Sequence, residues 1–371
     1  MTHHLKLCTN TKSVFFVLSN KCLRVCFRDA FLSKFNVADK LCTERSKVDC
    51  STKSLHRMPS GLCNNLEQPF VGNSHTAFGR LFSANYEDYV GEPRSKSVKG
   101  GPLPSCRKLS LELGSKPIFN RLFNNHFTIF GQYIAHDIAL SVPYTDTYST
   151  PISSCTCDSK YSKSKCTIID IPDDDPTLGG QKCMAFPMTA QAFKDEICSL
   201  GVKEQLNGNT HFIDLSGVYG STVRMSEALR YNDGLLKSTR RYGTRIMPPT
   251  QREGKSCSDA TSKHKCFAGG DSRLVINLLF TGIQTMFLRA HNDLAKLLKQ
   301  SCPLSGDNQV HEFTRTVITS YFQRVVYVEW LPTLLGSRYS LDFNILTAFK
   351  PTEYSADVKN ERERIDRFSM I

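Results

Sequence analysis

The sequence predicts a mainly α-helical protein, built as one large multi-helical domain with long loops and little β-structure. Three stretches support this prediction, because in each of them apolar residues recur every three or four positions, the period of an amphipathic helix. They lie at 118–140, 273–300 and 312–329. Strand-like alternation of apolar and polar residues is sparse, and no internal repeat is visible.

Residues 1–53 show little patterning, and we expect them to form an appendage that precedes a domain spanning 54–371. Their apolar stretch from Ser13 to Ser19 is shorter than the apolar core of a usual secretion signal. Residues 54–117 are rich in Gly, Pro, Asn and Arg, which predicts long loops with short helices.

The first periodic stretch predicts a buried helix, the second a helix with one apolar face, and the third a helix that ends near Leu331-Pro332. The apolar residues of the first stretch are Phe119, Leu122, Phe123, Phe127, Phe130, Ile134 and Ile138. Those of the second are Ile283, Met286, Phe287, Leu294 and Leu297.

The charge balance excludes few partners by itself. The chain has 47 Lys and Arg against 35 Asp and Glu, a net charge of +12. Basic and acidic residues are interspersed, without a dense basic helix or recognition motif, so we expect no nucleic-acid partner. The alternative that this basic protein binds an anionic surface rests only on its net charge. No apolar run approaches the ~18 residues of a membrane-spanning helix, so we expect no membrane span.

Cysteine usage predicts an extracellular or secretory-pathway protein. The chain has fifteen cysteines, an odd number, so at least one thiol is unpaired within the chain or bonded to another chain. Clustering in polar segments predicts a disulfide framework. The clustered residues are Cys155, Cys157, Cys166, Cys183, Cys257 and Cys266. The alternative is a zinc site formed by Cys22 and Cys26 with the His3-His4 pair.

Gln132 and His136 are four residues apart, so a helix places them on one face. Two polar groups on an otherwise apolar helix need partners if they are buried. They could be a pair of satisfied core groups or part of a site.

The segment 210–220 offers oxygen ligands at alternating positions. In an extended loop the side chains of Thr210, Asp214 and Ser216, with the carbonyl of Phe212, would point to one side. Calcium prefers such hard oxygen ligands, and Asp137 could add a carboxylate. A turn that caps a helix is the alternative explanation.

The third segment of interest begins with Gly269-Gly270-Asp271-Ser272-Arg273 and continues to Arg289-Ala290-His291-Asn292. Taken alone, it is a loop leading into a helix, with Arg273 an ordinary surface arginine.

The residues of these three segments, and their order along the chain, resemble those of the animal haem peroxidase family. The resemblance covers roughly residue 54 to the C-terminus. Its further matches are Cys63-Asn64-Asn65-Leu66, Phe78-Gly79-Arg80-Leu81, Tyr86-Glu87-Asp88, Ile171-Pro172, Asp175-Pro176, Cys183, Tyr327, Leu331-Pro332 and Gly336.

The resemblance implies a haem b cofactor and the reduction of H₂O₂ coupled to oxidation of small donors or halides. Oxidative-stress response and cross-linking of matrix or cuticle are roles of this kind. His136 is the expected distal histidine, a general base and then a general acid. Arg273 would stabilise the charge that develops as the O–O bond breaks, and Gln132 would hold water or a halide near the iron.

The resemblance also implies a structural Ca²⁺ bound by the residues that match the family's ligand positions. These are Asp137, Thr210, Phe212, Asp214 and Ser216. Because Asp137 follows His136 directly, the ion would fix the helix that aims the imidazole.

Two departures from the family concern the haem. Many members bind it through two ester bonds, at positions that here are Ala135 and Ile276, so we expect any haem to be held non-covalently beside these residues. The family's proximal histidine lies C-terminal to the matched motifs, whereas all ten histidines here lie at or before His311. We therefore expect a partial chain, with that ligand beyond Ile371.

Two alternatives remain at this stage. His291 could replace the proximal ligand, although it sits in a helix motif with a packing role. The chain could also be a catalytically inactive, calcium-stabilised extracellular binding or adhesion module of the same fold. The sequence leaves the oligomeric state and the reducing substrate open.

Overall fold

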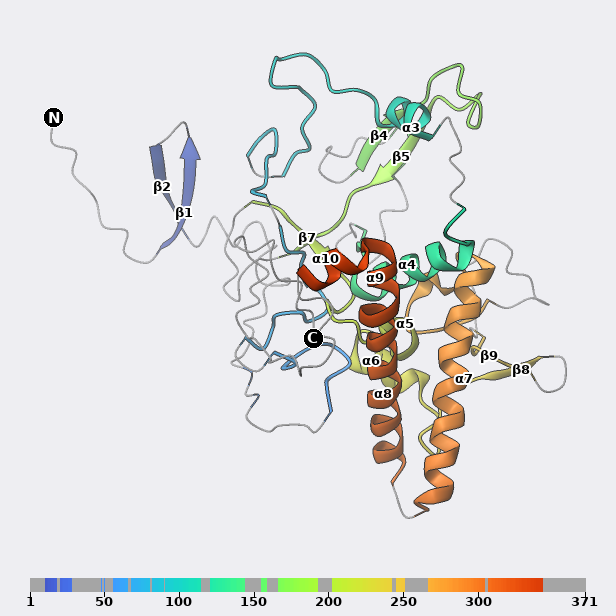
Figure 1. The fold of residues 1–371 in the computed structure, drawn as a ribbon. Helices are drawn as coiled ribbons and strands as arrows, with labels where there is room; N and C mark the ends of the chain where they lie inside the picture. The colour runs from blue at the N-terminus through green and yellow to red at the C-terminus, as the bar shows by residue number, and fades with distance from the viewer. Residues whose placement is uncertain are drawn as a thin grey trace. The chain divides into compact units, whose positions relative to one another are not determined.

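The computed structural model describes the chain in segments. They are residues 11–18, 21–28, 48, 50, 56–65, 68–80, 82–89, 91–114, 121–143, 155–158, 166–192, 202–241, 245–250, 266–303 and 306–342. The regular structure is mainly helical, which confirms the predicted fold class (Figure 1). Among these residues, no helix combines the length and apolar character needed to cross a membrane.

The chain divides into two compact units. Unit 1 comprises Met1–Asp49, Ser83–Glu112 and Pro143–Leu206, and unit 2 comprises Cys50–Phe82, Leu113–Val142 and Asn207–Ile371. The predicted domain boundary near residue 53 stays a prediction.

Unit 1 holds most of the β-structure. Strands β1 (Thr11–Leu18) and β2 (Lys21–Arg28) form an antiparallel hairpin. The sequence predicted only a poorly patterned appendage there, whose apolar residues at 14–18 are contiguous and do not alternate. Strands β4 (Cys166–Asp170) and β5 (Cys183–Pro187) form a second antiparallel pair, and β6 (Gln191–Ala192) pairs with β7 (Glu204–Asn207). Helix α3 covers Cys106–Gly114.

Disulfides confirm the prediction from cysteine clustering. In unit 1, Cys155 pairs with Cys166 and Cys157 with Cys183, so both bonds tie one loop to the β4–β5 pair. Unit 2 holds the Cys50–Cys63 bond, and Cys266 is disulfide-bonded too. Free thiols within the described segments are the exposed Cys106 and Cys302. Cys257, His3 and His4 lie outside the described residues, as do the side chains of Cys22 and Cys26.

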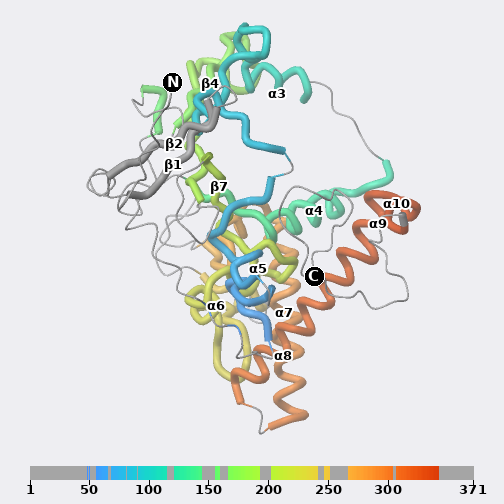
Figure 2. Tube along the Cα trace, turned by 90° about the vertical axis from the view of Figure 1, so that its left-hand side faces the viewer, coloured from blue at the N-terminus to red at the C-terminus, as the bar shows by residue number. Residues whose placement is uncertain are grey.

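Unit 2 is a helical assembly whose longest helices, α7 (Leu278–Ser301) and α8 (Asp307–Arg324), lie side by side (Figures 1 and 2). The other helices are α4 (Asn125–Ile138), α5 (Ser216–Tyr219), α6 (Val223–Leu229), the 3-10 helix η1 (Ser272–Val275), the π-helix η2 (Val325–Trp330), α9 (Leu331–Leu335) and α10 (Ser337–Asp342). Its short strands are β3 (Thr76–Ala77), β8 (Thr239–Arg241) and β9 (Arg245–Met247), of which β8 and β9 pair.

An aromatic cluster forms the centre of this core. The ring of Tyr133 on α4 lies 5.1 Å from that of Phe280, 5.9 Å from that of Phe287 and 5.8 Å from that of Phe322. These rings come from α4, α7 and α8 and are nearly completely buried. Burial of their large apolar area fixes α4 against the two long helices.

The predicted first helix was too long and too deeply buried. Helix α4 begins at Asn125, because the side chain of Asn124 accepts a hydrogen bond from the backbone N–H of Phe127 and caps the helix. Leu122 precedes the helix and is 87% exposed. Only one stripe of α4 is buried, at Tyr133, Ile134 and Asp137.

The second and third predicted helices differ from the structure at their starts and ends. Arg273 lies in η1 and not in α7, because Asn277 caps a new helix start by accepting from the N–H of Phe280. Met286 and Leu297, expected on the apolar face, are exposed. The third α-helix ends at Arg324, but the helical path continues through Pro332, which is tolerated in the first turn of α9.

Candidate functional site

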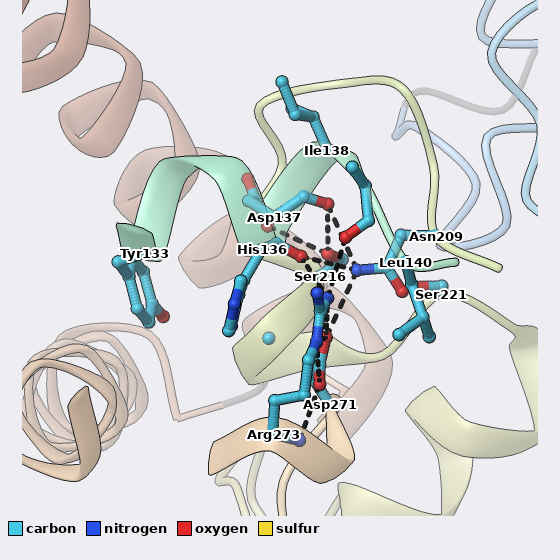
Figure 3. A network of polar contacts seen from close by, with 12 residues as sticks. Tyr133, His136, Asp137, Ile138, Leu140, Asn209, Ser216, Ser221, Asp271 and Arg273 are labelled. Carbon is cyan, nitrogen blue, oxygen red and sulfur yellow. Dashed lines mark hydrogen bonds and ion pairs between the residues drawn. The ribbon is translucent and has the colours of Figure 1, made fainter. Parts of the chain in front are cut away.

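The backbone carbonyls at the C-terminal end of α4 accept hydrogen bonds from several side chains. The last carbonyls of a helix have no partner within the helix. Here side chains take that place: Arg273 and Asn209 donate to the His136 oxygen, Ser216 to that of Asp137, and Asn207 to that of Ile138. This end of α4 is therefore fixed by segments remote in sequence (Figure 3).

Arg273 reaches α4 from η1. Its Nη2 lies 2.9 Å from both the His136 oxygen and the Ala139 oxygen. Its Nε and Nη2 also bond to the Asp271 carboxylate, at 3.0 Å and 2.5 Å. Nη1 makes no hydrogen bond within the described part of the chain. The reading of Arg273 as an ordinary surface arginine was thus wrong, since the side chain is half-buried and ion-paired.

Asp271 orients the Arg273 side chain. Burial tends to raise the pKa of the Asp271 carboxyl, but the hydrogen bonds and charge of Arg273 outweigh it, and the pKa lies below its ordinary value. The carboxylate also accepts from the backbone N–H of Arg273, which caps η1. Gly270 allows the backbone just before Asp271 to pack against the backbone of Ser216, because a Cβ at Gly270 would overlap the Ser216 carbonyl oxygen.

His136 shares this environment. Its ring packs against Phe280 at 4.9 Å, and its Nδ1 is buried without a hydrogen-bond partner among the described residues. Desolvation, and secondly the positive charge of Arg273, lower the pKa of the imidazole. The ring is therefore neutral at pH 7 and can accept a proton. Figure 3 shows the imidazole projecting from α4 toward η1, from which Arg273 extends toward α4.

Four of the five predicted calcium ligands lie together at the C-terminal end of α4. The Asp137 carboxylate accepts from the N–H groups of Asp214 and Leu215, each at 3.0 Å, and lies 2.9 Å from the Ser216 hydroxyl. Thr210 donates to Asp214 at 2.7 Å. The segment is a tight turn and not the extended loop that was expected, since Leu215 adopts a left-handed backbone conformation.

Phe212 is the fifth predicted ligand residue. Its ring packs closely against Gly72, and the guanidinium of Arg57 lies 5.8 Å above the ring centre. Its carbonyl makes no hydrogen bond within the described segments.

The charges of this cluster fit a divalent cation. Burial raises the pKa of Asp137 to about 6, and burial together with the neighbouring Asp137 raises the pKa of Asp214 well above its usual value. Asp214 Oδ1 is buried and has no hydrogen-bond partner among the described residues. Two neighbouring buried carboxylates with an unused oxygen are stabilised when a cation binds them both. The described residues include no cluster of three or more His, Cys, Asp or Glu, so no zinc-type site occurs among them.

The two positions expected beside a haem carry no carboxylate. Ala135 is exposed on α4, and Ile276 is 55% exposed just after η1. Gln132 is half-buried one turn before His136. This donor set fits a haem held by packing and hydrogen bonds, without ester bonds.

His291 has a packing role. It is completely buried on α7, its Nδ1 lies 2.9 Å from the Tyr219 hydroxyl, and its Nε2 lies 2.9 Å from the Gly234 oxygen. Both ring nitrogens are engaged, so His291 cannot supply an axial ligand, and that alternative is discarded.

Sequence reasoning missed Asn207 and Asn209. Both are buried, and they hold the end of α4 by their side-chain amides. Their only sequence signal is the polar run Asn207-Gly208-Asn209, which resembles an ordinary turn.

The helical fold and the order of its motifs place the chain in the class of helical haem peroxidases. It belongs to the animal haem peroxidase family, which it matches over residues 56–364.

Individual relatives agree with this assignment. The chain is 30% identical to a peroxidase of Drosophila melanogaster over 78% of this chain and 43% of that protein. It is 33% identical to a chorion peroxidase of Aedes aegypti over 78% of this chain and 38% of that protein. Among solved structures, peroxidase A of Dictyostelium discoideum has a similar fold, with a TM-score of 0.60 and 23% identity over 75% of this chain and 53% of that one. The chain thus spans about two fifths of the length of these curated relatives.

Proposed function

We propose that this chain carries the distal side of a haem peroxidase site, which reduces H₂O₂ while a small donor or a halide is oxidised. The proposal rests mainly on the contact between Arg273 and the residue His136. In this contact Arg273 Nη2 lies 2.9 Å from the backbone oxygen of His136. Bound haem b supplies the iron at which the oxidising equivalents of peroxide are stored.

His136 is proposed to move the proton. Its lowered pKa leaves the imidazole neutral at pH 7, so it takes a proton from one peroxide oxygen and returns it to the oxygen that leaves. Gln132, one turn earlier on α4, is proposed to hold the water or halide on the same face.

Arg273 is proposed to stabilise negative charge as the O–O bond breaks. The two nitrogens bonded to Asp271 and α4 hold the guanidinium in place, which leaves Nη1 as the donor for the reacting oxygen. A preoriented donor stabilises developing charge without reorganisation during the reaction.

A structural Ca²⁺ is proposed to lie between Asp137 and Asp214, with Thr210, Ser216 and the Phe212 carbonyl as further ligands. It would fix the residue that directly follows His136. We further propose an extracellular or secretory-pathway location, which the disulfides Cys50–Cys63, Cys155–Cys166 and Cys157–Cys183 support.

The test uses purified protein loaded with haemin, in a form that includes the expected proximal histidine. We expect a sharp Soret band and peroxide-dependent oxidation of a dye, and we expect His136→Ala to keep the band but to lose most of the oxidation. A matched control is His126→Ala, since His126 is exposed on the same helix. A Soret band without any peroxide-dependent oxidation in the unaltered protein would refute the enzyme and favour the binding-module alternative.

A further inference from the structure

Asn209 connects the two groups to which the proposed function assigns the peroxide reaction. Its side chain is buried, and its Nδ2 lies 2.6 Å from the His136 oxygen, 3.4 Å from the Asp137 oxygen and 3.3 Å from Asp271 Oδ2. A primary amide has two N–H groups, so one nitrogen can serve both the end of α4 and Asp271.

The amide is held in the orientation that this bridge requires. The Ser221 hydroxyl donates to Asn209 Oδ1 at 2.9 Å, which leaves Nδ2 facing the α4 carbonyls and Asp271 (Figure 3). The backbone N–H of Asn209 donates to Asn207 Oδ1 at 3.1 Å. The side chain therefore has a single arrangement that satisfies all its polar atoms.

The bridge acts on both reacting side chains through other groups. The His136 oxygen is the α4 carbonyl that Arg273 also bonds, and Asp271 is the carboxylate that holds the Arg273 guanidinium. A shift of Asn209 would move the end of α4 relative to η1. Because reacting groups must be placed to within a fraction of an ångström, such a shift is costly to a reaction that uses both.

We propose that Asn209 is a positioning residue, which sets the distance between His136 and the Asp271–Arg273 pair. This inference rests on the proposed function for its effect on peroxide but not for its effect on Arg273. It goes beyond the roles of His136, Arg273 and the calcium ligands, because Asn209 belongs to none of these.

The first test measures Arg273 directly and needs no haem. In protein labelled with ¹⁵N-arginine, the Nε–H signal of Arg273, assigned by its loss in Arg273→Lys, should exchange slowly with water. We expect Asn209→Ala to speed this exchange at least tenfold and Ser221→Ala, which frees the amide to turn, to speed it by a smaller factor.

The matched control is Asn292→Ala. Asn292 is a buried asparagine on α7 whose amide bonds the backbone of Leu236, and it has no bond to Asp271 or to α4. We expect Asn292→Ala to lower thermal stability while leaving Arg273 exchange unchanged. Unchanged exchange in both Asn209→Ala and Ser221→Ala, or an equal increase in Asn292→Ala, would overturn the proposal.

The second test uses the same haem-loaded protein, with the expected proximal histidine included. We expect Asn209→Ala to slow the reaction with H₂O₂ by about 10- to 100-fold, with an unchanged Soret band and an unchanged rate of donor oxidation after the peroxide step. A rate equal to that of the unaltered protein would overturn the positioning role. If the unaltered protein itself does not react with peroxide, the proposed function fails, and the exchange experiment still decides whether Asn209 positions Arg273.

Discussion

Arg273 and His136 are separated by 137 positions in the chain, yet the guanidinium of one donates to the backbone oxygen of the other at 2.9 Å. The contact is to the main chain, so it fixes the helix that carries the imidazole and leaves the imidazole itself free. The Arg273 side chain can therefore stabilise the fold and also contribute to the proposed peroxide site.

Replacement of Arg273 by Lys should therefore lower both activity and stability. A lysine ammonium cannot reach Asp271 and two carbonyls in one plane and also present a spare donor. We expect the reaction with H₂O₂ to slow by about 10²-fold or more. We expect the free energy of unfolding to fall by about 1–3 kcal/mol. Stopped-flow absorbance of the haem and thermal denaturation measure the two effects.

Arg224→Lys is the control, because Arg224 is exposed on α6. A rate loss of similar size in both variants would contradict the assignment of Arg273.

Removal of calcium should destabilise the protein through Asp214. A ligand at about 100 times its Kd stabilises the folded state by about 2.7 kcal/mol, so a chelator should lower the Tm of the unaltered protein. Asp214→Ala should have a low Tm that the chelator no longer changes, because the buried carboxylate that faces Asp137 is gone. Differential scanning calorimetry with and without EDTA makes the comparison.

The control for this experiment is Asp174→Ala, since Asp174 is exposed. Asp175, which lies in the same acidic run, is unsuitable, because Arg107 bonds its buried carboxylate and holds the pKa of that carboxyl well below its usual range. Insensitivity of the unaltered protein to EDTA would argue against the ion.

Two glycine substitutions should change stability in opposite directions. A Cβ at Gly131 would lie 2.6 Å from the Trp330 ring, so Gly131→Ala forces α4 and η2 apart and should cost about 1–3 kcal/mol. A Cβ at Gly282, on the exposed side of α7, would meet nothing within 4 Å, so Gly282→Ala should stabilise by about 0.5–1 kcal/mol. Chemical denaturation measures both, and destabilisation by Gly282→Ala would contradict the packing described for α7.

Acid should destabilise the protein through two buried histidines. Burial is the main cause that lowers the pKa of His291 to about 4 and that of His311 to about 3. The charge of His291 lowers the pKa of His311 further, and the charges of Arg230 and Arg315 lower both pKa values. Gly234 O, which faces both rings, opposes the shift. The unfolded chain binds these protons near pH 6.5 and the folded one does not, so stability is full above pH 6.5 and falls as the pH drops toward 4 and 3.

The slope contributed by each histidine is at most about 1.4 kcal/mol per pH unit. His311→Asn keeps a donor near the Gly234 oxygen and removes the titrating ring, so it should flatten the pH dependence of the unfolding free energy. Urea denaturation between pH 4 and 7 tests this, and an unchanged slope would contradict it.

Sequence alone determined the fold class, the family and the disulfide framework of this protein. These are properties of local pattern: apolar residues at helical spacing, motifs in a fixed order, and cysteines in clusters. The structure and the relatives confirm all three. Helix ends were predicted poorly. Asn124 and Asn277 cap helices inside the periodic stretches, at positions where the hydropathy pattern shows no change.

Only the tertiary structure decided how the parts of the site meet. It showed that Arg273 is bonded to α4, that His291 is fully occupied, and that Asp175 belongs to an ion pair. It also revealed Asn209, which in the sequence resembles part of an ordinary turn. The physical reason is that the carbonyls at the end of a helix need partners that local sequence cannot supply. In this chain the partners come from residues 69 to 137 positions away, and only the folded chain brings them together.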